Sequence, residues 1–93
     1  MIARRGPKPY PASMITAGQV RAARALIGWK QGDLAQAAGV GEAVVKNLER
    51  GSSDPRASTL LAIQAAFERH GVVFLGNGDT RDGGPGVRLK REI

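Results

Sequence analysis

Between Gln31 and Gly51 the sequence brings together amide, carboxylate and cationic side chains, the groups in this chain most able to interact with a ligand. Glu42, Asn47 and Arg50 are among them, and they alternate with apolar residues as the polar side of a helix does. Groups of these kinds donate and accept hydrogen bonds and pair with opposite charges. Their chemistry is therefore that of recognition.

The residues that catalysis or metal binding would need do not come together in this sequence. It contains no cysteine and one histidine, His70, with no cluster of His, Cys and carboxylate residues and no nucleophile–base set. The glycine-rich segment 76–86 lacks the Lys-Ser/Thr pair and the following helix of a phosphate-binding loop. We therefore expect no enzyme activity, no metal and no cofactor, and we expect His70 on the surface or at a helix end.

Length and charge restrict the class of protein. Ninety-three residues allow one small domain, and the net charge of +6 favours a polyanionic partner. A basic surface that is merely solvated would give the same charge. The absence of cysteine fits a reducing cytoplasm, and no apolar run approaches the roughly 20 residues of a membrane span. We expect a cytoplasmic protein without a secretory signal or a membrane segment.

Two short helices joined by the turn Gly39-Val40-Gly41 are predicted between Gln31 and Gly51. Gly39 and Gly51 each follow an apolar-periodic run, where a glycine can adopt the left-handed conformation that ends a helix. Helices this short are not stable alone, so they must pack on each other. The residues that would face inward are small or aliphatic, namely Leu34, Ala35, Ala38, Val40, Val45 and Leu48.

One further helix on each side completes the predicted helical domain. Thr16 is a candidate N-cap for the first helix, which runs to about Ile27 and ends at Gly28. Ser58 is a candidate N-cap for the last helix, which runs to about His70. The residues expected to be buried are Val20, Ala23, Leu26 and Ile27 in the first helix, Trp29 after it, and Leu60, Leu61, Ile63, Ala66 and Phe67 in the last helix.

After residue 71 the pattern changes to that of two strands. Val72–Leu75 is rich in β-formers, and Val87–Lys90 alternates apolar and basic residues. A lone two-stranded ribbon is marginal in water, so it must pack on the helices or pair with a second subunit. The predicted organisation is a flexible, basic and Pro-rich tail at 1–15, a helical domain at 16–71 and a β ribbon at 72–93.

Residues 31–51 resemble the helix-turn-helix of the lambda repressor and Cro family, also called the XRE family. The resemblance extends over about residues 16–71, more than half of the chain. Gly41 departs from it, because the family usually has a Ser or Thr N-cap there, although glycine also caps a helix moderately well. The matching residues are Gln31, Leu34, Ala35, Gly39, Val40, Val45, Leu48, Glu49, Gly51, Pro55, Thr59 and Leu60.

The resemblance implies a mainly α fold, a lambda-repressor-like bundle of four helices with a helix-turn-helix, which the C-terminal two-stranded β ribbon would follow. It implies a sequence-specific DNA-binding transcriptional regulator of a bacterium or phage, cytoplasmic and nucleoid-associated when bound. We expect a homodimeric repressor that binds a palindromic operator through the major groove of double-stranded DNA. The alternative is the antitoxin of a toxin–antitoxin pair, which binds a toxin and regulates its own operon. RNA binding is less well supported, because the sequence lacks an aromatic platform.

In this family the second helix of the motif enters the major groove, and residues near its start reach base edges. The resemblance therefore assigns base reading to Glu42, Ala43, Val44, Lys46 and Asn47. Asn can pair with adenine, Glu can accept a hydrogen bond from cytosine N4, and Ala or Val can touch a thymine methyl. Glu42 has an alternative role, which is to stabilise the N-terminus of its own helix.

Phosphate contacts are expected from residues around the reader helix. Gln31 matches the family position whose amide grips the DNA backbone, and the basic tail is either disordered or an arm along the DNA. The phosphate candidates, each also a common solvated residue, are Lys30, Gln31, Arg50, Ser52, Ser53 and Arg56. Glu49 matches a family position that pairs with an arginine of the first helix, and Arg24 occupies that arginine's place. This ion pair would be structural and not catalytic.

Dimerisation is assigned to the ribbon. A helix-turn-helix gains most from two half-sites, so we expect a sheet formed between two subunits. The alternative is a hairpin that only covers its own core, and a protein partner such as a toxin or co-regulator would use the ribbon or the tail. The residues assigned to dimerisation are Val72, Val73, Phe74, Leu75, Val87 and Leu89.

Overall fold

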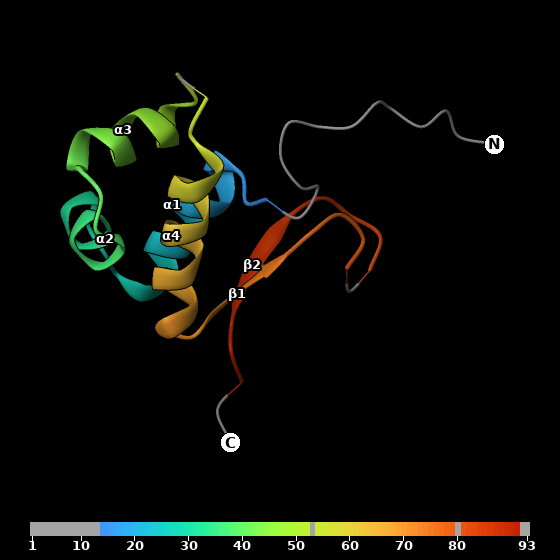
Figure 1. Ribbon diagram of the computed structural model, residues 1–93. Helices are drawn as coiled ribbons and strands as arrows, with labels where there is room; N and C mark the ends of the chain where they lie inside the picture. The colour runs from blue at the N-terminus through green and yellow to red at the C-terminus, as the bar shows by residue number, and fades with distance from the viewer. Residues whose placement is uncertain (1–13, 53, 80, 92–93) are drawn as a thin grey trace.

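A computed structural model of the chain describes residues 14–52, 54–79 and 81–91. Figure 1 shows four helices gathered on one side and a two-stranded antiparallel sheet beside them. The elements are α1 (Ala17–Ile27), α2 (Gln31–Ala38), α3 (Glu42–Arg50), α4 (Ala57–Arg69), β1 (Val72–Leu75) and β2 (Gly86–Leu89). The predicted fold class is confirmed. Most of the predicted tail, residues 1–13, lies outside the described residues.

The ends of the first three helices follow the local signals in the sequence. Thr16 caps α1, because its Oγ1 accepts a hydrogen bond from the Gln19 backbone N–H at 3.1 Å. Gly28, Gly39 and Gly51 end α1, α2 and α3 with φ values of 70°, 72° and 70°, a left-handed conformation that costs a side chain with a Cβ. The short turn after Gly39 thus brings the chain directly into α3.

Two predicted boundaries are wrong by one or two residues. The first residue of α4 is Ala57 and its N-cap is Arg56, so Ser58 lies inside the first turn and does not cap it. Arg56 has the extended backbone of an N-cap, and its carbonyl accepts from the Leu60 N–H at 3.1 Å, which begins the helix two residues earlier than predicted. The last strand is Gly86–Leu89 and not Val87–Lys90.

The core is formed where the four helices and β1 meet. Its largest fully buried side chains are Phe67, Leu34, Ile63, Val20, Val45 and Val72. Leu26 and Leu61 were expected in this core, but they are 41% and 56% exposed. Each lies about 100° around its helix from a neighbour that is buried or half-buried, which places it beside the inward stripe and not on it.

Trp29 links α1 to the core as a half-buried aromatic residue. Its ring stacks on Phe67 at a centroid distance of 5.6 Å, and His70 packs edge-on against it at 4.6 Å. His70 is exposed at the end of α4, with Nδ1 2.9 Å from the Ala66 carbonyl oxygen. No helix in the described ranges is long and apolar enough to cross a membrane.

The hairpin formed by β1 and β2 covers the core of its own chain. Val72 is 2% exposed, and Phe74 and Val87 are half-buried against the same core, with Phe74 at 5.8 Å from the Phe67 ring. Val72 is therefore not available to a second subunit, contrary to its assignment to dimerisation. Val73 and Leu89 remain 37% and 49% exposed.

Gln19 fastens the hairpin to α1. The side chain is 6% exposed, and its Nε2 donates to the carbonyl oxygens of Leu75 at 2.9 Å and Gly86 at 2.8 Å. Its Oε1 accepts from the Thr16 N–H at 2.9 Å, which completes a capping box. One amide thus ties the start of α1 to the distal end of the strand pair.

We expect Gln19→Leu to lower the free energy of unfolding by about 1–3 kcal/mol, because the Thr16 N–H and two strand carbonyls lose a buried partner. Urea unfolding measures this loss, and hydrogen exchange should report faster opening of β1 and β2. Gln64→Leu is the control, since within the described residues that amide donates to the exposed Glu68 carboxylate and to no buried group. Equal changes in both variants would show that Gln19 has no special role.

Candidate DNA-binding surface

Helix α3 has one buried side and one exposed side. Val45, Leu48 and Glu49 face the interior, with 0%, 3% and 4% exposure. The residues assigned to base reading lie together on the accessible side: Glu42, Ala43, Val44 and Lys46 are exposed, and Asn47 is half-buried. Burial of the inward side fixes the helix, so the outward residues are presented on a rigid support.

A buried ion pair joins α3 to α1. Arg24 Nε lies 2.6 Å from Glu49 Oε2, and Arg24 Nη2 donates to Glu49 Oε1 at 2.8 Å, so the guanidinium binds both carboxylate oxygens. Arg24 Nη1 also donates to the Trp29 carbonyl at 3.0 Å. Arg24 and Glu49 therefore form the contact that the resemblance implied, and it also holds the segment that leads into α2.

Gln31 and Arg21 complete the contacts of Glu49. Gln31 Nε2 donates to Glu49 Oε1 at 3.0 Å, and Arg21 Nη1 donates to the Glu49 backbone carbonyl. The Gln31 amide was assigned to a DNA phosphate, and in the free protein one of its N–H groups is engaged inside the domain. Its role toward phosphate stays a prediction.

The surroundings of Glu49 favour its charged form. Burial would raise the pKa of the Glu49 carboxyl, but hydrogen bonds from Arg24 and Gln31 and the charges of Arg24 and Arg21 outweigh it, and the pKa lies below the ordinary value of 4.5. The hydrogen bond to Glu49 raises the pKa of Arg24 against the opposing effect of burial. Both groups are therefore charged at neutral pH.

The exposed side of α3 adjoins the loop that leads into α4. A hollow of about 310 Å³ lies between them, lined by Val44, Asn47, Leu48, Pro55, Arg56 and Thr59. Asn47 Oδ1 accepts from Arg50 Nη2 at 2.8 Å, and the Asn47 backbone carbonyl accepts from Ser52 Oγ at 3.2 Å. Arg50, Ser52 and Arg56 thus border the reader residues, whereas Ser53 lies outside the described residues.

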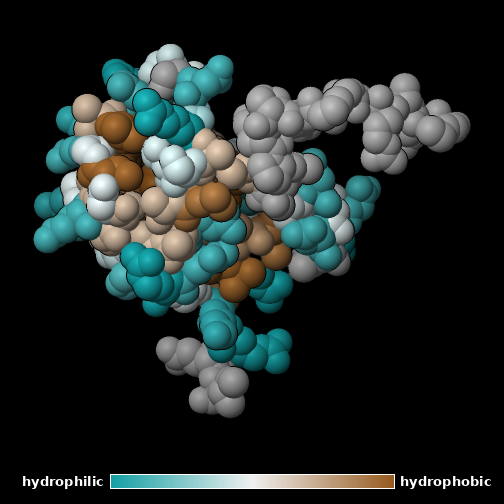
Figure 2. Space-filling view, in the orientation of Figure 1, coloured by the Kyte–Doolittle hydropathy of each residue, from teal (hydrophilic) through white to brown (hydrophobic). Residues whose placement is uncertain are grey.

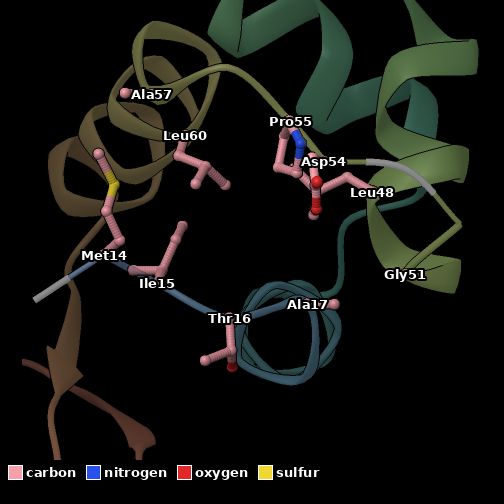
Figure 3. A pocket seen from close by; sticks show the side chains of 10 residues that line it. All are labelled: Met14, Ile15, Thr16, Ala17, Leu48, Gly51, Asp54, Pro55, Ala57 and Leu60. Carbon is pink, nitrogen blue, oxygen red and sulfur yellow. The ribbon is translucent and has the colours of Figure 1, made fainter. Parts of the chain in front are cut away.

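A second groove, of about 540 Å³, opens beside the C-terminal end of α3. Figure 3 shows Leu48 of α3, Leu60 of α4 and Ile15 ahead of α1 around it. Among the described residues that line it, Asp54 is the charged one. The groove is mainly apolar, so it adds no phosphate-binding cation to the surface of α3.

The helix order, the turn and the exposed α3 can be compared with known families. A family model described as helix-turn-helix matches residues 20–73. The chain belongs to this family. The match spans α1 to the start of β1 and supports a lambda repressor/Cro-like, DNA-binding transcriptional regulator. A comparison with curated proteins found no match.

Arg21 and Thr59, two residues that contact or border α3, were missed in the sequence. Arg21 lies three positions before Arg24 on the same face of α1, a spacing that could have indicated a second contact to α3. Thr59 lines the hollow beside Asn47, but a threonine in the first turn of a helix carries no distinctive signal. Lys30, by contrast, was assigned to phosphate and lies exposed before α2.

We expect Glu49→Ala to lower the free energy of unfolding at pH 7 by about 3–5 kcal/mol, because Arg24 is left half-buried without its partner. Urea unfolding measures the loss. Because the pKa of Glu49 is lower in the folded protein, the ion pair stabilises the fold fully above about pH 4.5, the ordinary pKa of a glutamate. This stabilisation is lost as the pH falls through the lower pKa that Glu49 has in the folded protein. The difference between wild type and variant should therefore shrink on acidification below 4.5.

Glu68→Ala is the matched control, because Glu68 is exposed on α4 and, in the part of the chain that the structure describes, its carboxylate accepts from the Gln64 amide and pairs with no cation. Its removal should change stability by less than about 0.5 kcal/mol. An unchanged melting temperature in Glu49→Ala would contradict the structural role of the ion pair.

Proposed function

We propose that this regulator is a sequence-specific repressor that binds a palindromic operator as a homodimer, with α3 in the major groove. One observation carries the proposal. The residues that could read bases share the exposed side of α3, whose buried side is held by the Arg24–Glu49 pair. A helix fixed in this way can present hydrogen-bonding groups without paying to order them. The proposal implies a cytoplasmic protein of a bacterium or phage.

Base reading is proposed for Glu42, Ala43, Val44, Lys46 and Asn47. Val44 is an exposed apolar residue at 41%, which suits contact with a thymine methyl group. Asn47 can pair with adenine through its carbonyl oxygen and amide nitrogen. Because Asn47 Oδ1 accepts from Arg50 in the free protein, this bond must open or be shared when a base is bound.

Phosphate contact is proposed for the polar residues that surround α3. The cations Lys30, Arg50 and Arg56 are all exposed, each next to an end of a helix. Such contacts set the position of the protein on DNA but carry little sequence information. Gln31 and Ser52 would add uncharged donors, and the same role is proposed for Ser53.

We expect Asn47→Ala to relax the preference for one base pair, with a loss of about 1–3 kcal/mol on the preferred sequence only. Arg50→Ala should weaken all sequences alike and reduce the slope of log K against log salt by about 1. Selection from a random pool of duplexes followed by salt titration measures both effects. Wild-type binding without any sequence preference would overturn the proposal.

A homodimer is proposed because one α3 reads only one half-site. Figure 2 shows hydrophobic surface where the sheet meets the helical body. Of the residues assigned to dimerisation, Val73 and Leu89 are exposed, at 37% and 49%, and Leu75 is half-buried. Leu89 pairs with Val72 and so lies on the inward face of the hairpin, whereas Val73 and Leu75 lie on the outward face. We therefore propose contacts from Val73 and Leu75, while Val72, Phe74 and Val87 support the hairpin from beneath and Leu89 borders this contact.

We expect Val73→Lys, on the outward face of the hairpin, to weaken self-association at least tenfold, because a contact between two apolar surfaces would then have to bury a charge. Sedimentation equilibrium measures the association constant. Leu61→Lys is the control, since Leu61 is also exposed, at 56%, but lies on α4. A monomeric wild type with selected sites that lack a repeated half-site would rule out the homodimer. Co-purification with a second small protein in its place would favour the antitoxin alternative.

A further inference from the structure

Glu42 places a carboxylate over the first turn of α2. A Cβ built on Gly32 would lie 3.3 Å from Glu42 Oε1 and 3.7 Å from its Cδ, so the glycine leaves room for this side chain. Lys46 Nζ is 3.9 Å from Glu42 Oε2 and the Glu42 side chain is 54% exposed. Glu42 is the first residue of α3, so its carboxylate lies at the N-terminal end of the helix surface proposed to contact DNA.

Another carboxylate, that of Asp33, lies in the first turn of α2 itself. Asp33 Oδ2 accepts a hydrogen bond from the Lys30 backbone N–H at 2.9 Å, so that side chain is used in capping. Among the described residues Glu42 pairs with Lys46, and both side chains are more than half exposed, so the pair is weak and leaves the carboxylate open to a ligand. Any DNA phosphate that approaches the start of α3 therefore meets a like charge.

A carboxylate at this place can accept hydrogen bonds but cannot donate them. In the major groove, guanine and thymine present acceptors, and adenine presents its N6 donor beside the N7 acceptor. Cytosine presents the N4 donor without an adjacent acceptor. Of the four bases, cytosine is thus the one that can donate a hydrogen bond to the Glu42 carboxylate without also placing an acceptor against it.

We propose that Glu42 is a specificity-determining residue that selects a cytosine in each half-site and weakens binding to all other DNA by repelling phosphate. Discrimination arises from a penalty on wrong sequences as well as from a contact to the right one. The inference rests on the proposed DNA binding through α3. It goes further by naming the base and by assigning Glu42 a negative contribution to non-specific affinity.

Glu42→Gln tests both parts. Wild type should prefer cytosine at one half-site position about fivefold or more, a single-base effect of ordinary size. Gln pairs with adenine through its amide, so the variant should shift that preference from cytosine to adenine. Its affinity for duplexes without the operator should rise about three- to tenfold at low salt, because one like charge near phosphate is gone. Glu42→Ala should show the same rise and no preference at that position.

Glu68→Gln is the control, since it removes one negative charge from an exposed site on α4, away from α3. It should keep the cytosine preference and raise non-specific affinity by less than about twofold. The inference is overturned if Glu42→Gln retains the cytosine preference or gains no more non-specific affinity than Glu68→Gln. A wild type that binds DNA without sequence preference would instead overturn the proposed function itself.

Discussion

The carboxylate of Glu49 is the point at which three helices are joined. It accepts from Arg24 of α1 through both oxygens and from Gln31 of α2 through one of them, while the backbone carbonyl of Glu49 accepts from Arg21. These bonds fix α3 relative to α1 and α2 at its C-terminal half, where Leu48 is also buried. Because this end of α3 is fixed, the exposed residues of the helix are held in one orientation relative to α1 and α2.

Net stability is a weak reason for such a pair, since taking two charges out of water costs about as much as their attraction returns. An apolar pair could fill the same space, but it would not specify an angle between helices as a bidentate contact does. The unequal burial of the two partners fits this view, with Glu49 at 4% and the Arg24 side chain at 21% exposure. We infer that the pair serves orientation more than stability, although losing one partner would still be costly.

Features set by neighbouring residues could be predicted from the sequence, and features set by distant ones could not. Gly28, Gly39 and Gly51 end their helices as predicted, because a left-handed terminus depends on local backbone energy. Gln19 was missed, because its carbonyl partners are 56 and 67 residues away. Leu26 and Leu61 were wrongly predicted to be buried. The width of the buried stripe on a helix depends on the elements packed against it, and the periodicity of the sequence does not give that width. The Arg24–Glu49 contact was accessible only through the family resemblance.

Two carboxylates of α3, those of Glu42 and Glu49, lie beside the first turn of α2. They differ in burial and in hydrogen-bond partners, which suits one to holding the helix in place and the other to contacting a ligand. Glu49 accepts from Gln31, and Glu42 lies against Gly32, so adjacent residues of α2 contact opposite ends of α3. The N-terminal turn of a helix favours negative charge, so both positions stabilise α2. Glu49 is buried and bonded to Arg24 and Gln31, whereas Glu42 is 54% exposed and its carboxylate can accept hydrogen bonds from a ligand. The phosphate contact proposed for Gln31 and the base contact proposed for Glu42 thus involve neighbouring residues at one turn of α2, an arrangement that would couple the grip on the DNA backbone to the reading of sequence.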